Sequence, residues 1–163
     1  MAQTLNRSLT DLGALLHLVD PTLPIGGFNH SNGLETFVQQ RVVESKARLE
    51  EYVQTQLLQN WIYNDCAYLS LAFDAMCEGN FDRLCELDWQ LSATKVARES
   101  REGSFKLGVR LLKIFIRYET HALLTAYQQA IAEKRVQGYF PIVFAMVAQA
   151  MGLSKADTLY AFY

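Results

Sequence analysis

Histidine side chains are the first groups to consider for chemistry, because imidazole binds metals and transfers protons near neutral pH. The three histidines are His17, His30 and His121, and none of them has an HxH or HExxH neighbour. No Ser-His-Asp, Cys-His or paired-carboxylate arrangement is evident. The pattern therefore predicts a protein without a catalytic centre of its own, while a metal site assembled from distant residues stays open.

The cysteines are Cys66, Cys77 and Cys85, an odd number without a CxxC pair, which argues against a disulfide framework and against a zinc finger. On one continuous helix Cys66 and Cys77 would lie about 16 Å apart along the axis, too far to share a metal. We expect three free thiols that pack as small apolar residues. A helical metal-binding protein or enzyme that uses His30, His121 or these cysteines is the alternative to the function predicted below.

Residues 18–35, LVDPTLPIGGFNHSNGLE, place two prolines, three glycines and an aromatic residue between helical segments. Proline fixes φ, whereas Gly26 and Gly27 open backbone conformations denied to other residues, so the run predicts a shaped turn. It is not a phosphate-binding P-loop, because no lysine follows Gly33. The apolar side chains of this turn, Ile25 and Phe28 among them, must be buried either under the domain's own helices or against another chain.

A second group of candidates lies on a helix predicted between Lys95 and Tyr118. At 100° per residue four of its cations fall within a stripe of about 60°, and most other directions are apolar. These cations are Lys106, Arg110, Lys113 and Arg117. The stripe is either a solvated edge with buried stems or a cationic rim for an acidic protein partner.

One turn earlier, Arg98 and Arg101 project onto the continuation of the apolar face, where a charge requires a partner. That partner is either an internal carboxylate, such as Glu99 or Glu102, or a group on another subunit or protein, since arginine is enriched at interfaces.

The elements that position these residues are all predicted to be helices, because no alternating strand pattern and no hairpin signal occurs. We expect an all-α, single-domain helical bundle over residues 1–163. Ser45 and Ser154 are predicted N-caps, and Pro141 is predicted in a first helical turn. Helix ends or breaks are predicted at Asp20, Gln40, Asn64–Asp65, Glu78–Asn80, Ala93, Gly103, Glu119–His121, Gly138 and Gly152, with Asn29 or Ser31 capping the second helix. The predicted core comprises Leu15, Leu49, Val53, Leu57, Phe73, Leu91, Val109, Leu112, Phe144 and Val147.

The last predicted helix begins at Lys155 and ends in apolar residues with no polar tail, so we expect the domain to lack a C-terminal segment. The formal net charge of −2 argues against nucleic acid and anionic membranes as partners. No basic segment with an apolar run opens the chain, and no stretch reaches the roughly 18 apolar residues of a membrane span. We therefore expect a cytoplasmic protein whose partners are proteins.

Three runs carry a family resemblance. DPTLPIGGFNHSNGLE resembles the N-terminal motif of the UreF family of urease accessory proteins, in which an LP-x-GG-aromatic turn precedes S-x-GLE. ARESREGSFKLGVRLLKIF is similar to the family's arginine-rich helix, and GYFPIVFAMVAQAMGLS resembles its aromatic-Pro helix with a Gly-Leu stop. The resemblance covers essentially all of the chain from Leu12 to Tyr163.

The resemblance implies an all-helical, cytoplasmic homodimer that has no catalytic activity of its own and uses no cofactor. It implies a chaperone for nickel insertion that binds UreD, called UreH in some systems, the GTPase UreG and apo-urease. The family's chains also carry a C-terminal segment that takes part in contacts with UreD/UreH and UreG. The predicted partner-binding residues are Pro24, Ile25, Gly26, Gly27, Phe28, Ser31, Glu35, Arg98, Glu99 and Arg101.

Overall fold

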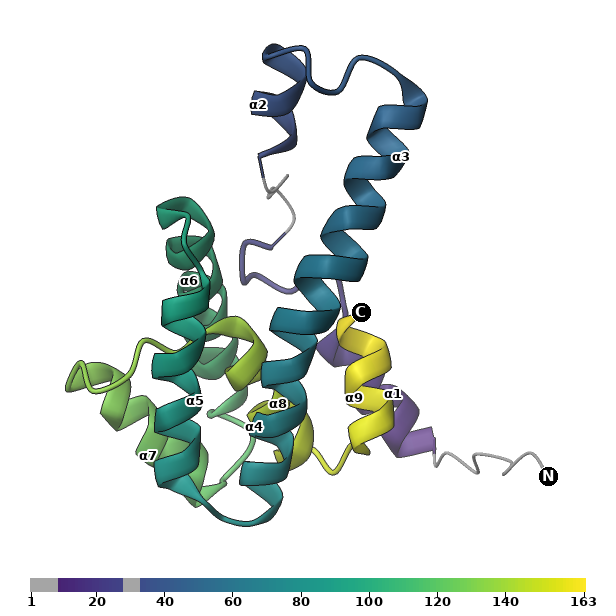
Figure 1. The fold of residues 1–163 in the computed structure, drawn as a ribbon. Helices are drawn as coiled ribbons and strands as arrows, with labels where there is room; N and C mark the ends of the chain where they lie inside the picture. Colours follow the sequence, from purple (N-terminus) through teal and green to yellow (C-terminus); the bar gives the residue numbers. More distant parts are fainter. Residues whose placement is uncertain (1–8, 28–32) are drawn as a thin grey trace.

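The computed structural model describes residues 9–27 and 33–163, and all its regular elements are helices (Figure 1). They are α1 (Leu9–Leu18), α2 (Leu34–Gln39), α3 (Lys46–Thr55), the π-helical η1 (Gln56–Cys66), α4 (Ala67–Cys77), α5 (Phe81–Thr94), α6 (Arg98–Phe115), α7 (Ala122–Ala132), α8 (Phe140–Ala150) and α9 (Lys155–Phe162). No strand occurs among the described residues. The all-α prediction is confirmed.

Helix α8 lies at the centre of the bundle, where it packs against α4 on one side and α6 on the other. Residues 141–148 are all buried, so the helix is apolar on every side, as expected for a core helix. Pro141 lies in its first turn and Gly152 follows its end with φ of 78°, as predicted. Of the predicted core residues, six are buried: Leu15, Phe73, Leu91, Leu112, Phe144 and Val147.

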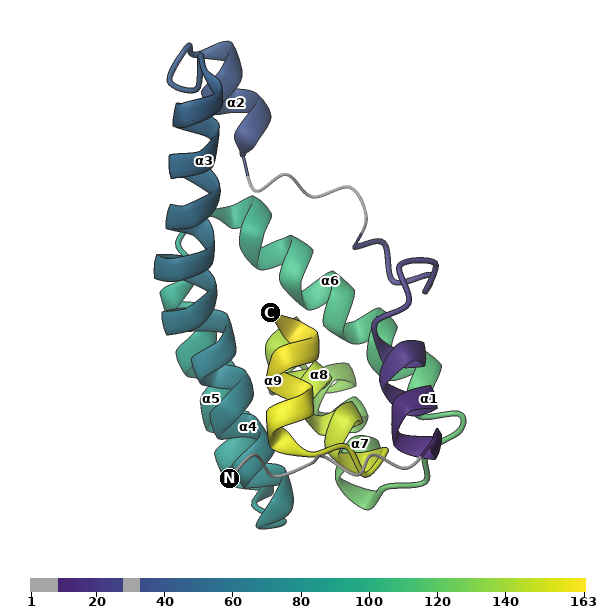
Figure 2. The same cartoon turned by 90° about the vertical axis from the view of Figure 1, so that its right-hand side faces the viewer.

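The predicted helix break at Asn64 and Asp65 is wrong. Helices α3, η1 and α4 follow one another without a gap and form one rod of roughly 45 Å (Figure 2). Both polar side chains have partners at the end of α5. Asn64 Oδ1 accepts a hydrogen bond from Thr94 Oγ1 at 2.9 Å, and Asp65 Oδ1 lies 2.7 Å from Lys95 Nζ. The Asp65 contact is an ion pair without hydrogen-bond alignment. These contacts join the π-helical segment to the end of α5.

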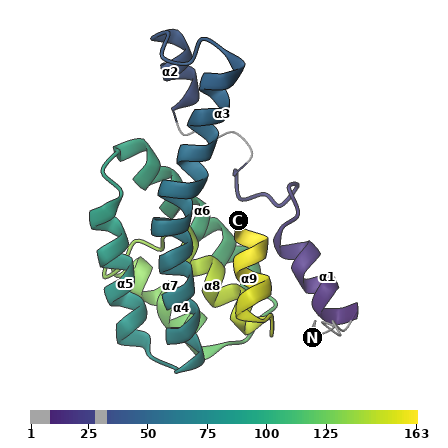
Figure 3. The same cartoon turned by 45° about the vertical axis from the view of Figure 1, so that its right-hand side comes forward.

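Helices α2 and α3, with the connection between them, project beyond the rest of the bundle in all three views (Figures 1, 2 and 3); we call them the arm. Leu49 and Val53, predicted as core, are 38% and 44% exposed there. Their four-residue spacing does give α3 an apolar side, but no other described element covers it. Leu57 and Val109 are only half-buried, so four of the predicted core residues are wrong.

Two further helix ends differ from the prediction. Helix α6 runs through Gly103 without a break, because a helical glycine costs only about 1 kcal/mol and the helix buries a large face. Helix α7 ends at Ala132, before Lys134 with φ of 59°, so Gly138 is not its cap. The predicted caps Ser45 and Ser154 are confirmed. Asn29 and Ser31 lie outside the described residues, and α2 begins after Gly33.

The loop between α7 and α8 is held by a buried carboxylate that the sequence did not reveal. Asp88 of α5 is 1% exposed and accepts hydrogen bonds from Tyr127 Oη at 2.7 Å and from the backbone N–H groups of Gln137, Gly138 and Tyr139 at 2.7, 2.9 and 3.1 Å. Burial beside Asp88 raises the pKa of Tyr127 well above its usual value, first through desolvation and then through the carboxylate charge. This cluster fixes where α8 enters the core.

Candidate functional site

Hydrogen bonds within the glycine-rich turn link residues from Asp20 to Ile25. Asp20 Oδ1 accepts from Thr22 N at 2.7 Å and from Thr22 Oγ1 at 2.6 Å, which lowers the pKa of the Asp20 carboxyl. The backbone N–H of Leu23 donates to Asp20 O at 3.0 Å. The prediction of a shaped turn is therefore confirmed for the part that the structure describes.

This turn rests on α6. Arg110 Nη1 donates to Ile25 O at 3.0 Å, and Gly26 has φ of 82°. This φ is one that L side chains rarely adopt, and a β-carbon on Gly26 would also displace the Arg110 guanidinium, so the position favours glycine. A β-carbon on Gly27 would make only ordinary contact with Leu107. Ile25 is half-buried and packs against the core of its own chain.

The remaining residues predicted around the turn have different places. Pro24, Gly26 and Gly27 are exposed on the turn, and Glu35 is exposed in the first turn of α2 on the arm. Phe28 and Ser31 lie outside the described residues. The structure therefore brings Pro24, Ile25, Gly26 and Gly27 together on α6.

Arg98 is exposed, so its predicted place on the apolar face is wrong, but its predicted internal partner Glu102 is confirmed. Arg101 is half-buried, and backbone carbonyls take the place of the predicted carboxylate. The Arg98 side chain is 79% exposed and its Nε donates to Glu102 Oε1 at 2.7 Å, an interaction that raises the pKa of the guanidinium. Arg101 Nη1 donates to the carbonyls of Lys95 and Val96 at 2.8 and 2.6 Å, where α5 has ended and leaves acceptors unpaired. Both arginines are satisfied within the chain.

Arg98, Arg101 and the exposed Glu99 form the N-terminal turn of α6. Arg110 follows Arg98 by twelve residues, roughly 18 Å along the helix. The predicted binding residues therefore form two separate surfaces, one at the N-terminal turn of α6 and one where the glycine-rich turn contacts α6 through Arg110.

The arm carries an exposed apolar surface that the predictions assigned to the core. The Phe37 and Tyr52 rings, with centroids 5.5 Å apart, join α2 to α3. Exposed apolar side chains on the arm and along η1 are Phe37, Val38, Val42, Leu49, Val53, Leu58, Ile62 and Tyr63. The signal was present in the sequence as a four-residue apolar spacing, but that spacing is the same for a core face and for an interface.

The candidate metal ligands are dispersed among the described residues. His121 caps α7, with its Nδ1 accepting from Leu123 N at 3.3 Å, and the His17 ring packs 5.2 Å from that of Phe115. Desolvation raises the pKa of the half-buried Cys66 and Cys85 thiols, which disfavours the thiolate that binds metals. His30 lies outside the described residues, and within the rest no group of three or more His, Cys, Asp or Glu side chains could hold an ion.

Within the described ranges, no helix is both long and apolar enough to cross a membrane.

Comparison with known proteins places the chain in one family. A family model described as UreF matches residues 43–163. The chain is 98% identical over all of its 163 residues to a protein named urease accessory protein UreF from Haemophilus influenzae, of which it covers 69%. It is 80% identical over 152 residues, 93% of the chain, to the protein of that name from Actinobacillus pleuropneumoniae serotype 5b, of which it covers 67%.

A more distant relative extends the same comparison. The urease accessory protein UreF of Lachnoclostridium phytofermentans is 33% identical over 148 residues, which are 91% of this chain and 65% of that protein. The chain thus spans about two thirds of the length of these relatives. The family match, over most of the chain and in agreement with the three sequence landmarks, shows that the chain belongs to the UreF family.

Proposed function

We propose that this chain promotes urease maturation by binding other proteins and has no catalytic activity of its own. The proposal is supported by the family's printed name and by the character of the surface. Among the described residues, the arm exposes apolar side chains, His121 caps a helix, and the Cys66 and Cys85 thiols are half-buried.

The exposed apolar side chains of the arm carry the proposal. Leu49 and Val53 lie one turn apart on α3, and the following segment η1 exposes further apolar side chains, Leu58, Ile62 and Tyr63. Contiguous exposed apolar surface is unfavourable in water and marks sites of protein association. A helix that projects from its bundle can lay this face into a groove of a partner. We propose that the arm binds in this way.

The proposed partners are a second copy of the chain, a UreD/UreH-type accessory protein, a UreG-type GTPase and apo-urease, with nickel as the cargo delivered in the cytoplasm. The exposed predicted residues Pro24, Glu35, Arg98 and Glu99 remain candidates for these contacts. Ile25 packs against the core and Arg101 donates to backbone carbonyls of its own chain, so in this proposal they position the binding surface and do not contact the partner.

The experiment compares Val53→Asp with Gln54→Asp, its exposed neighbour on α3, in the full-length protein. Both variants add one carboxylate to the same helix turn, but only Val53→Asp places it on the apolar side. We expect Val53→Asp to lose capture of purified UreD/UreH and UreG, or to lose self-association in sedimentation, with an unchanged melting temperature. Capture and self-association equal to those of Gln54→Asp would overturn the proposal.

A further inference from the structure

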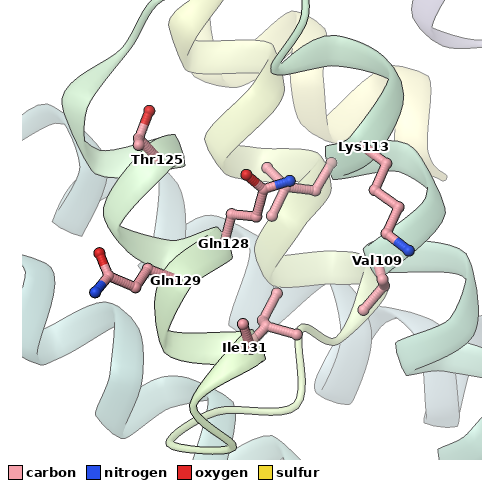
Figure 4. A pocket seen from close by; sticks show the side chains of 8 residues that line it. Val109, Lys113, Thr125, Gln128, Gln129 and Ile131 are labelled. Atoms are coloured by element: carbon pink, nitrogen blue, oxygen red, sulfur yellow. The ribbon is translucent and has the colours of Figure 1, made fainter.

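A groove of about 490 Å³ lies between α6 and α7, on the flank of α6 that bears Lys113 (Figure 4). Val109, Leu112, Ile131 and Ala132 form its apolar lining. Figure 4 shows Gln128 and Ile131 projecting from α7 toward α6, with Lys113 on the opposite rim. Thr125 and Gln129 complete the polar rim.

Among the described residues, Lys113 is the one charged residue that lines this groove, and further cations follow the lining residues just after α6 and α7. Two of the four cations in the α6 stripe have partners within the chain: Arg110 donates to Ile25 O, and Lys106 pairs with Glu102 at 3.1 Å. Lys113, on the groove rim, and Arg117, one turn further on, have neither an acidic nor a carbonyl partner among the described residues. Both side chains are exposed.

Another exposed cation follows the lining residues Ile131 and Ala132 in the sequence. Lys134, whose N–H donates to Ile131 O at 3.0 Å, is exposed and also lacks an acidic partner within the described ranges. The adjacent acid Glu133 is occupied by Arg135 at 2.7 Å and by Gln129 at 2.8 Å. Residues 113–134 contain three cations and two acids, Glu119 and the occupied Glu133, so this stretch has an excess of positive charge.

We propose that this groove binds an acidic amphipathic helix of a partner protein. An apolar floor between two helices accepts the apolar side of a third helix, and acids on its flanks would meet Lys113, Arg117 and Lys134. A second copy of the chain placed groove to groove would set these cations against one another. The negative net charge of the chain and the apolar floor disfavour nucleic acid.

The inference rests on the proposed function, because it assumes protein partners, but it concerns a different surface from the arm. The test places p-benzoylphenylalanine in place of Thr125, on the exposed groove rim, in the full-length protein mixed with purified UreD/UreH and UreG. After irradiation, mass spectrometry identifies the cross-linked segment. We expect an acidic amphipathic helix of one of these two proteins.

Charge reversal then tests complementarity. Lys113→Glu should lower the cross-link yield at subsaturating partner about tenfold, the effect of about 1.4 kcal/mol. Arg83→Glu, the same reversal on α5 away from the groove lining, should leave it unchanged, and both variants should keep the melting temperature. Cross-links to a second copy, to a segment that is not acidic or to nothing, or an unchanged yield for Lys113→Glu, would each overturn the inference. If the groove inference fails but Val53→Asp on the arm still abolishes capture of UreD/UreH and UreG, the proposed function stands without the groove.

Discussion

Asp88→Asn should destabilise the fold more than any other single loss of one charge in α5. The carboxylate is almost fully buried and accepts four hydrogen bonds, three of them at Oδ2 from Tyr127, Gly138 and Tyr139 and one at Oδ1 from Gln137. An asparagine can keep its oxygen toward the three donors only by turning its own NH2 group toward the N–H of Gln137.

The magnitude follows from this geometry. Three hydrogen bonds change from charged to neutral acceptors at a loss of about 1 kcal/mol each, and the half-buried N–H of Gln137 loses its acceptor at about 1 kcal/mol. The smaller desolvation cost of a neutral amide offsets part of this sum. We therefore expect a loss of about 2 to 4 kcal/mol, a large share of the 5 to 15 kcal/mol typical of a domain.

Urea unfolding at pH 7, followed by far-ultraviolet circular dichroism, measures this loss as a lower midpoint with an unchanged slope. Glu86→Gln is the matched control, because it removes one charge from an exposed side chain of the same helix, and it should cost less than about 0.5 kcal/mol. A loss below about 1 kcal/mol for Asp88→Asn would refute the role given to this carboxylate.

Three more predictions concern buried contacts. Because the pKa of Tyr127 is raised, the folded state keeps a proton that the unfolded state releases above about pH 10. The free energy of unfolding should therefore fall above that pH by up to about 1.4 kcal/mol per pH unit. Urea unfolding at alkaline pH measures this fall, and Tyr127→Phe should abolish it. Lys95→Met leaves the Asp65 carboxylate buried and unpaired and should cost about 3 kcal/mol in urea unfolding, most of which the added change Asp65→Leu should restore. Gly108→Ala should destabilise by at least about 1 kcal/mol because its β-carbon would collide with a loop carbonyl, whereas Gly13→Ala, with open space around it, should raise the melting temperature.

Local chemistry in the sequence predicted much of the fold. The caps at Ser45 and Ser154, the first-turn Pro141 and the end at Gly152 depend on neighbours a few residues away, and all four are confirmed. The predicted break at Asp65 failed because its partner, Lys95, is thirty residues distant and no local pattern reveals it.

The same limit applies to the site. Periodicity identified the apolar side of α3, but it cannot tell whether the cover comes from the same chain or from another, so Leu49 and Val53 were placed in the core. The helical angle alone predicts both Arg98 and Arg101 inward, but Glu102 holds Arg98 at the surface, while Arg101 is half-buried and donates to carbonyls after the end of α5. The docking of the glycine turn through Arg110 also depends on a contact over 85 residues.

The most direct test of the arm's role is nickel-dependent urease activity in cells that carry the urease genes but lack their own copy of this gene. The cells receive the full-length protein with Leu49→Asp and Val53→Asp together, or with Gln54→Asp as control, at equal levels of folded protein. We predict that the double variant lowers activity about tenfold or more, equivalent to at least about 1.4 kcal/mol of lost association, while the control keeps it. Activity equal to the control would contradict the claim that the arm binds the maturation partners.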